Sequence, residues 1–171
     1  MANAPEYSPG LAGVPAARTS VCYLDGSVGK LQYRGYPIEV LAENCTFEEV
    51  AYLLLYGELP NAQQLAKFDH ELRQVRKVKF RIVDVLKTLP ESGHPMDALT
   101  VAVAAMGMFY KGDHVKDLEF RRLSAIRLIA KLPTIVAAWH RIRRGDEPIA
   151  PNPDLSHAAN FLYMLEGEVP T

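Results

Sequence analysis

The segment 92–110 constrains the fold of this chain more than any other. It reads Ser-Gly-His-Pro-Met-Asp-Ala-Leu and continues as an almost uncharged run. Proline suits the first position of a helix because the N–H of that residue has no partner within the helix, so Pro95 predicts a helix start. Asp97 follows in the first turn, where a carboxylate meets the positive end of the helix dipole. We therefore expect a helix over 95–110.

This helix is predicted to be enclosed by protein on nearly every side. Between Ala98 and Met108 the only polar side chain is Thr100, and most of the others are small enough to let a second helix approach closely. A longer predicted helix, over about 117–144, carries an apolar stripe that continues across Pro133. We expect self-association or a partner chain on these two helices. The candidate dimer-interface residues are Ala98, Ala102, Ala105, Met106, Phe109, Ile126, Ile129 and Val136.

The N-terminal part of the chain is predicted to be non-helical. Residues 1–20 are rich in Pro, Gly and Ala, and we expect an extended arm there. Residues 21–33 alternate apolar and polar side chains around Asp25-Gly26, a pair suited to a turn with positive φ, and predict a β-hairpin. After about residue 37 every strong pattern is helical.

The remaining helices are predicted from their end signals. Thr46 with Glu49, and Asn61 with Gln64, each have the spacing of a capping box, which marks a helix start. The predicted helices cover about 47–56, 61–77, 80–89 and 154–166. The fold class is therefore mainly α, and residues 21–171 form one helical part with a small hairpin, since no stretch within them has the composition of a linker.

Composition narrows the function classes. Lys and Arg total 19 against 20 for Asp and Glu, so the whole chain has no electrostatic preference for nucleic acid or an acidic membrane. Two cysteines, Cys22 and Cys45, predict neither a disulfide framework nor a zinc site. The first residues do not resemble a secretion signal, and the apolar runs are too short to span a bilayer. We expect a cytoplasmic protein.

The histidines offer one functional alternative. His94 precedes the predicted helix and either fixes the entry of the chain into that helix or contacts an anion or effector at its N-terminus. His140 is expected at the edge of a packed helix. His70, His114 and His157 are expected to face solvent or to cap helices.

A basic run offers a second alternative. Residues 73–81 include Arg73, Arg76 and Lys79 and form either a phosphate-binding patch or a solvated helix face. The neutral charge of the whole chain favours the solvated face. We see no nucleotide-binding loop, metal-ligand cluster or nucleophile–base motif, and assign no catalytic, substrate-binding or metal-ligating residue.

Six segments carry a resemblance to a known family. They are Gly10–Val14, Leu31–Ile38, Glu49–Gly57 with Leu59-Pro60, Gly93–Asp97, Ala130–Val136 and Asp154–Leu165. In these segments, and in the same order, the chain resembles the citrate synthases and 2-methylcitrate synthases, and the resemblance covers residues 10–171. It implies roughly the N-terminal half of such an enzyme, with the multi-helical part of its large domain in residues 21–171.

This resemblance implies an acyltransferase of the tricarboxylic acid cycle that condenses acetyl-CoA with oxaloacetate and hydrolyses the thioester. The CoA thioester is then a substrate, no cofactor is bound, and the enzyme is a homodimer. The family's catalytic histidines, in Leu-His-x-Asp-His-Glu and Gly-Pro-Leu-His-Gly-Gly stretches, and its later aspartate have no match here. We therefore carry over no catalytic role and expect the chain alone to be inactive.

Several functional interpretations stay open at this point. The chain is a portion of a citrate synthase, or a small subunit whose catalytic partner is a separate chain, or a non-catalytic helical module with a binding or regulatory role. Within the first, a 2-methylcitrate synthase using propionyl-CoA is the alternative to a citrate synthase.

Overall fold

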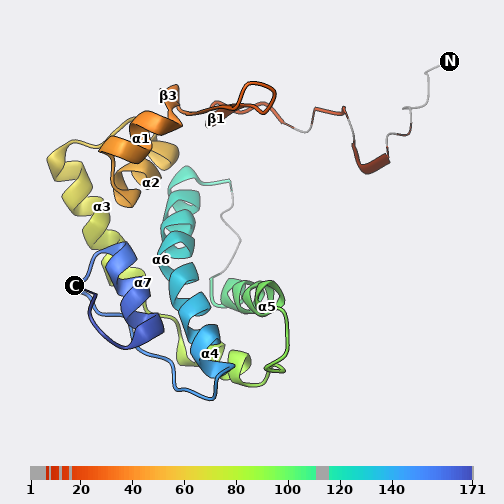
Figure 1. Cartoon of the computed structure of the whole chain (residues 1–171), viewed down its shortest axis with the longest axis vertical. Coiled ribbons are helices and arrows are strands. Elements are labelled where there is room, and N and C mark those ends of the chain that lie inside the picture. The colour runs from red at the N-terminus through yellow and green to blue at the C-terminus, as the bar shows by residue number, and fades with distance from the viewer. Residues whose placement is uncertain (1–6, 8, 12, 16, 111–115, 171) are drawn as a thin grey trace. The chain divides into compact units, whose positions relative to one another are not determined.

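The computed structural model describes residues 7, 9–11, 13–15, 17–110 and 116–170. These residues fall into two compact units, residues 1–45 and 46–171. Most of the described chain is helical, with one small antiparallel sheet near the N-terminus (Figure 1), so the predicted fold class is confirmed.

The first unit contains the sheet and one helix. Strands β1 (Cys22–Asp25) and β2 (Lys30–Tyr33) form the predicted hairpin, with Leu24 opposite Leu31. A third strand, β3 (Tyr36–Pro37), extends the sheet in the order β1-β2-β3 and was not predicted. It leads directly into α1 (Ile38–Asn44), and a short 3-10 turn, η1 (Pro9–Leu11), precedes the sheet.

The hairpin turn differs from the predicted Asp25-Gly26 pair. The Asp25 carboxylate accepts hydrogen bonds from the Ser27 N–H at 3.0 Å and from the Ser27 hydroxyl at 2.6 Å. Gly29, and not Gly26, has the positive φ, of 64°. The side chain of Asp25 therefore shapes the start of a four-residue turn, and the left-handed residue comes at its end.

The second unit consists of helices. They are α2 (Phe47–Tyr56), α3 (Ala62–Val75), α4 (Phe80–Lys87), α5 (Pro95–Gly107), α6 (Leu118–Ile142) and α7 (His157–Glu166). Both capping boxes are confirmed. Thr46 Oγ1 accepts the Glu49 N–H at 3.3 Å, and Asn61 Oδ1 accepts the Gln64 N–H at 2.9 Å.

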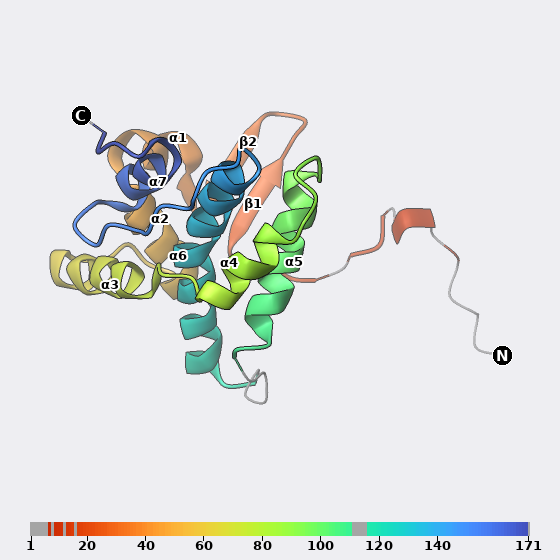
Figure 2. The same cartoon turned by 90° about the horizontal axis from the view of Figure 1, so that it is seen from below.

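Helix α6 is central to this unit. Figures 1 and 2 show α3 and α7 on one side of it and α4 and α5 on the other. Its first half packs on α2 and α3 through Ile126 and Ala130. Its second half packs on α4 and α5 through Ile135 and Trp139, so the packing partners change near Pro133, which lies inside the helix.

Helix α5 is less enclosed and shorter than predicted. Ala98, Ala102 and Met106 are buried against α4 and α6, whereas Val101 is 38% exposed and Met108 86%. Its neighbours therefore cover one face only. The helix ends at Gly107, three residues before the predicted end.

Other helix limits also differ from the predictions. Helix α3 ends at Val75, where side chains of α6 bond the carbonyls of the last helical residue and of the two residues after it. Lys131 Nζ donates to the Val75 and Lys77 carbonyls, and Thr134 Oγ1 donates to the Arg76 carbonyl at 3.1 Å. Helix α4 ends at Lys87, and Thr88 Oγ1 donates to the Val85 carbonyl there.

Helix α7 begins three residues later than predicted. Ser156 is its N-cap, and Ser156 Oγ accepts the Ala159 N–H at 3.2 Å. Asp154 lies in the preceding loop, where its N–H donates to Asn152 Oδ1 at 2.9 Å. Ser156, which is closer to the apolar run than Asp154, is therefore the residue that caps α7.

Candidate functional site

The predicted interface residues divide into buried and accessible sets. Ala98, Ala102, Met106 and Ile126 lie in the core of this chain, each at most 4% exposed. Ala105 and Ile129 are half-buried. Phe109 is 37% exposed and Val136 is 40% exposed. A dimer role for these residues stays a prediction, and the exposed side chains around them are the ones that can contact another chain directly.

The structure favours the structural role of His94. It is the N-cap of α5, and His94 Nδ1 accepts the Met96 N–H at 3.2 Å. His70 is exposed, and His140 is half-buried with Nε2 3.4 Å from Arg144 Nη1, both as expected. His114 lies outside the described residues.

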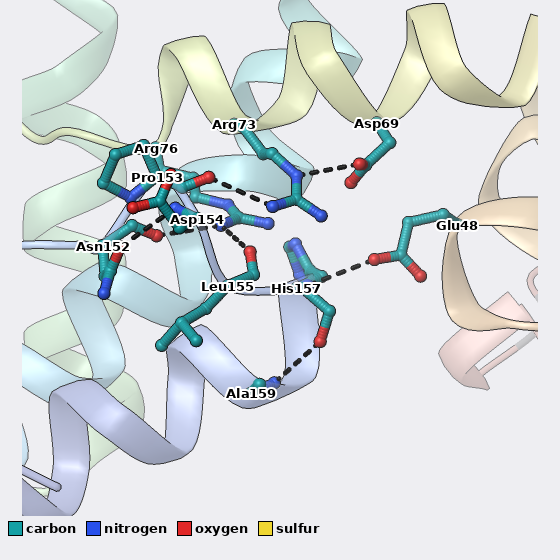
Figure 3. Close-up of polar contacts among 11 residues, drawn as sticks. Glu48, Asp69, Arg73, Arg76, Asn152, Pro153, Asp154, Leu155, His157 and Ala159 are labelled. Carbon is teal, nitrogen blue, oxygen red and sulfur yellow. Dashed lines mark hydrogen bonds and ion pairs between the residues drawn. The ribbon is translucent and has the colours of Figure 1, made fainter. Parts of the chain in front are cut away.

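The prediction for His157 is wrong, because this side chain is buried. It is 8% exposed, and its ring stacks on the Phe47 ring with the centroids 4.6 Å apart and the planes 9° apart. Its backbone N–H donates to Glu48 Oε1 at 3.1 Å (Figure 3). Two neighbouring residues of α2 therefore hold the first residue of α7.

The solvated-face interpretation of the basic run 73–81 is wrong for its first two arginines. Arg76 is 1% exposed, and its Nη1 donates to the Leu155 carbonyl at 2.7 Å and to the Asn152 carbonyl at 3.4 Å. Arg73 is half-buried and donates to the Pro153 carbonyl at 3.1 Å (Figure 3). Sequence reasoning missed this site because the acceptors are backbone carbonyls far along the chain.

These groups form a charged cluster where α2, α3 and α7 meet. Arg73 Nε donates to Asp69 Oδ2 at 2.8 Å, within α3. Burial lowers the pKa of Arg76, and the positive charge of Arg73 lowers it further. Burial also lowers the pKa of His157, with Arg76 as the second cause, while Glu48 and Asp69 act in the opposite direction.

Lys131 is a further buried cation that the sequence did not single out. It is 6% exposed, and burial is the main cause that lowers the pKa of its ammonium group. Because Nζ donates to two carbonyls at the end of α3, the group serves as a helix cap. This placement favours a structural role over a catalytic one.

A groove of about 990 Å³ runs along α4 and α6. Its lining includes the apolar side chains of Leu86, Ile135 and Ile149. One side carries the salt bridge between Lys87 Nζ and Glu147 Oε2, which are 2.7 Å apart. The residues that line the groove include no histidine, cysteine or serine.

Two negative findings apply to the described residues. No group of three or more His, Cys, Asp or Glu side chains is placed to hold a metal ion. None of the described helices combines the length and the apolar character that crossing a membrane requires.

Comparison with known proteins gives the family. The family model described as "Citrate synthase, C-terminal domain" matches residues 10–171. The chain is 50% identical to the citrate synthase of Acidithiobacillus ferridurans over 171 residues, covering 97% of this chain and 44% of that protein. It is 42% identical to a 2-methylcitrate synthase of Mycobacterium tuberculosis, covering 97% of this chain and 42% of that protein.

The fold agrees with the same family. The crystal structure of citrate synthase from Pyrobaculum aerophilum matches with a TM-score of 0.85 and 41% identity, covering 95% of this chain and 43% of that chain. The chain therefore spans less than half the length of the relatives it matches. It belongs to the citrate synthase family.

Proposed function

We propose that this chain is the scaffold portion of a citrate synthase that condenses acetyl-CoA with oxaloacetate to give citrate and CoA in the tricarboxylic acid cycle. The observation that carries the proposal is the family match over residues 10–171, together with 50% identity to a citrate synthase. We further propose a cytoplasmic homodimer, with the CoA thioester as a substrate and no bound cofactor.

The chemistry of this reaction explains why a scaffold alone is insufficient. A carboxylate base must remove a proton from the acyl methyl group, and hydrogen-bond donors must stabilise the enol and polarise the ketone. In this chain His94 caps α5 and His157 is packed on Phe47. We propose that residues outside this chain supply the catalytic groups.

We expect the isolated chain to release no CoA from acetyl-CoA plus oxaloacetate above background. The measurement is a thiol assay on a sample whose mass is verified. Co-expression with the part of the Acidithiobacillus ferridurans citrate synthase that this chain does not match should restore CoA release. Turnover by the isolated chain would contradict the scaffold role, and a stable complex without turnover would favour a non-catalytic binding or regulatory subunit.

The same assay separates the two substrate classes. The match to a 2-methylcitrate synthase at 42% identity keeps propionyl-CoA as the second candidate. In the complemented enzyme we expect kcat/KM to be higher for acetyl-CoA than for propionyl-CoA. The opposite order would favour 2-methylcitrate synthase.

We propose that α5 and α6 carry the surface for self-association, or for a separate catalytic chain. Val101 lies on the open face of α5 and Met108 follows its last residue, and on α6 Leu123 is 41% exposed and Leu128 is 37% exposed. We propose that these side chains form one contiguous apolar patch, which is unusual on a monomer. The exposed side chains therefore support an interface on these two helices. The buried alanines of the same helices hold that interface in position.

Replacing Val101 with glutamine is expected to weaken this association by about 1–3 kcal/mol if a second helix packs closely here. Size-exclusion chromatography with light scattering on a dilution series measures the effect. Val28→Gln is the matched control, because Val28 is 71% exposed in the hairpin of the first unit. A wild-type monomer at high concentration, unchanged by either substitution, would contradict the interface.

A further inference from the structure

We propose that His157 is the proton-sensitive element of a latch that holds the loop 152–155 and the start of α7 against α3. The latch consists of Glu48, Arg73, Arg76 and His157. It is closed while the His157 ring is neutral and opens when the ring is protonated. This inference concerns the local structure of the chain and does not depend on the proposed enzymatic activity.

The geometry shows what the latch holds. Arg73 and Arg76 donate to three carbonyls of the loop, those of Asn152, Pro153 and Leu155 (Figure 3). Asn160 Oδ1, from the first turns of α7, accepts the Asn152 N–H at 2.8 Å. The backbone of the loop is therefore held by the two arginines and by one side chain of α7.

The His157 ring occupies the position where this loop joins α7. It is stacked on Phe47, and its backbone N–H is held by Glu48, so its position is set by α2 as well as by α3. Nδ1 of the ring is buried and has no hydrogen-bond partner among the described residues. In a neutral ring this nitrogen can be the unprotonated one, whereas protonation makes both ring nitrogens donors. A protonated ring would then bury an N–H without an acceptor.

The charges around the ring balance only while it is neutral. Glu48 on α2 and Asp69 on α3 carry negative charge. Arg73 on α3 and Arg76, which directly follows α3, carry positive charge. Asp154, in the loop, is exposed to solvent. Protonation of His157 would add a third cation to a partly buried cluster with two anions. Arg76 cannot relieve this charge, because an arginine keeps its proton.

The pH dependence follows from the direction of the shift. Burial lowers the pKa of His157 below its ordinary value of 6.5 in the folded chain. The unfolded or locally opened chain therefore binds the proton at a higher pH than the folded chain does. The stabilisation is complete above about pH 6.5 and is lost as the pH falls from there through the pKa of the folded state.

Two measurements on the whole chain test the latch. Carbon–proton NMR of the His157 ring between pH 5 and pH 8 gives its pKa. Hydrogen exchange of the amides of residues 155–160, corrected for intrinsic exchange, gives the opening of the loop and α7. We expect protection to fall with pH, by about tenfold for each unit by which the pKa of His157 is lowered.

The variant His157→Phe separates the latch from general effects of pH, since phenylalanine keeps a flat ring for stacking on Phe47 and does not titrate. It should abolish the pH-dependent loss of protection. His70→Gln is the matched control, because His70 is exposed on α3, and this variant should behave as the wild type.

A loss of protection that persists in His157→Phe would overturn the proposal, as would a His157 pKa at or above 6.5. If His157→Phe does not fold, the ring titration of the wild-type chain decides the question.

Discussion

Replacing Leu86 with alanine is expected to lower the free energy of unfolding by about 2–5 kcal/mol. Leu86 is fully buried in α4, in the cluster that joins α4, α5 and the second half of α6. Truncation removes apolar burial and leaves a cavity, because the alanines and the tryptophan around it are fixed on two other helices. This is one of the largest effects we expect from a single substitution.

Urea denaturation followed by tryptophan fluorescence measures this effect. Trp139 is the only tryptophan of the sequence and lies in the same cluster, 3% exposed, so its emission reports on the packing that Leu86 completes. Leu24→Ala is the control, because Leu24 is 71% exposed. Equal changes for the two variants would show that Leu86 is not part of a packed core.

Replacing Gly93 with alanine is expected to cost about 1–3 kcal/mol of stability. A Cβ at Gly93 would lie 2.9 Å from the carbonyl oxygen of Pro90, which is a backbone atom. The Gly93 N–H donates to the same oxygen at 2.8 Å, so the turn cannot move away without losing this hydrogen bond. The substitution should therefore distort the turn that leads into α5.

Gly107→Ala is the matched control and should have the opposite sign. Gly107 is the last residue of α5, and a Cβ there would meet nothing within 4 Å. Alanine favours helix over glycine, so we expect a gain of up to about 1 kcal/mol. Thermal unfolding of the two variants measures both effects. A destabilised Gly107→Ala, or an unchanged Gly93→Ala, would contradict this account.

The elements that could be predicted from the sequence are those set by neighbouring residues. The start of α2 follows from Thr46 and Glu49, and that of α3 from Asn61 and Gln64, because each capping box needs only two residues three positions apart. Pro95 marks the start of α5 for the same reason. The interactions that determine these starts lie within one turn of the helix.

The features that could not be predicted depend on distant residues. His157 is buried because Phe47 and Glu48, on another helix, provide a stacking surface and an acceptor. Arg76 leaves the solvent because it meets backbone carbonyls of the loop before α7, which no sequence motif marks. In the sequence both residues resemble ordinary polar surface residues. They are buried because three helices pack together around them.

The way in which α3 ends has a consequence for the synthesis of this chain. Its last carbonyls are bonded by Lys131 and Thr134, and Lys131 lies 56 positions after Val75. At about 5–20 residues per second a ribosome needs roughly 3–11 s to add that length. During this interval the carbonyls of Val75, Arg76 and Lys77 lack these side-chain partners. The contacts that bond the end of α3 therefore form only after this part of α6 has been synthesised.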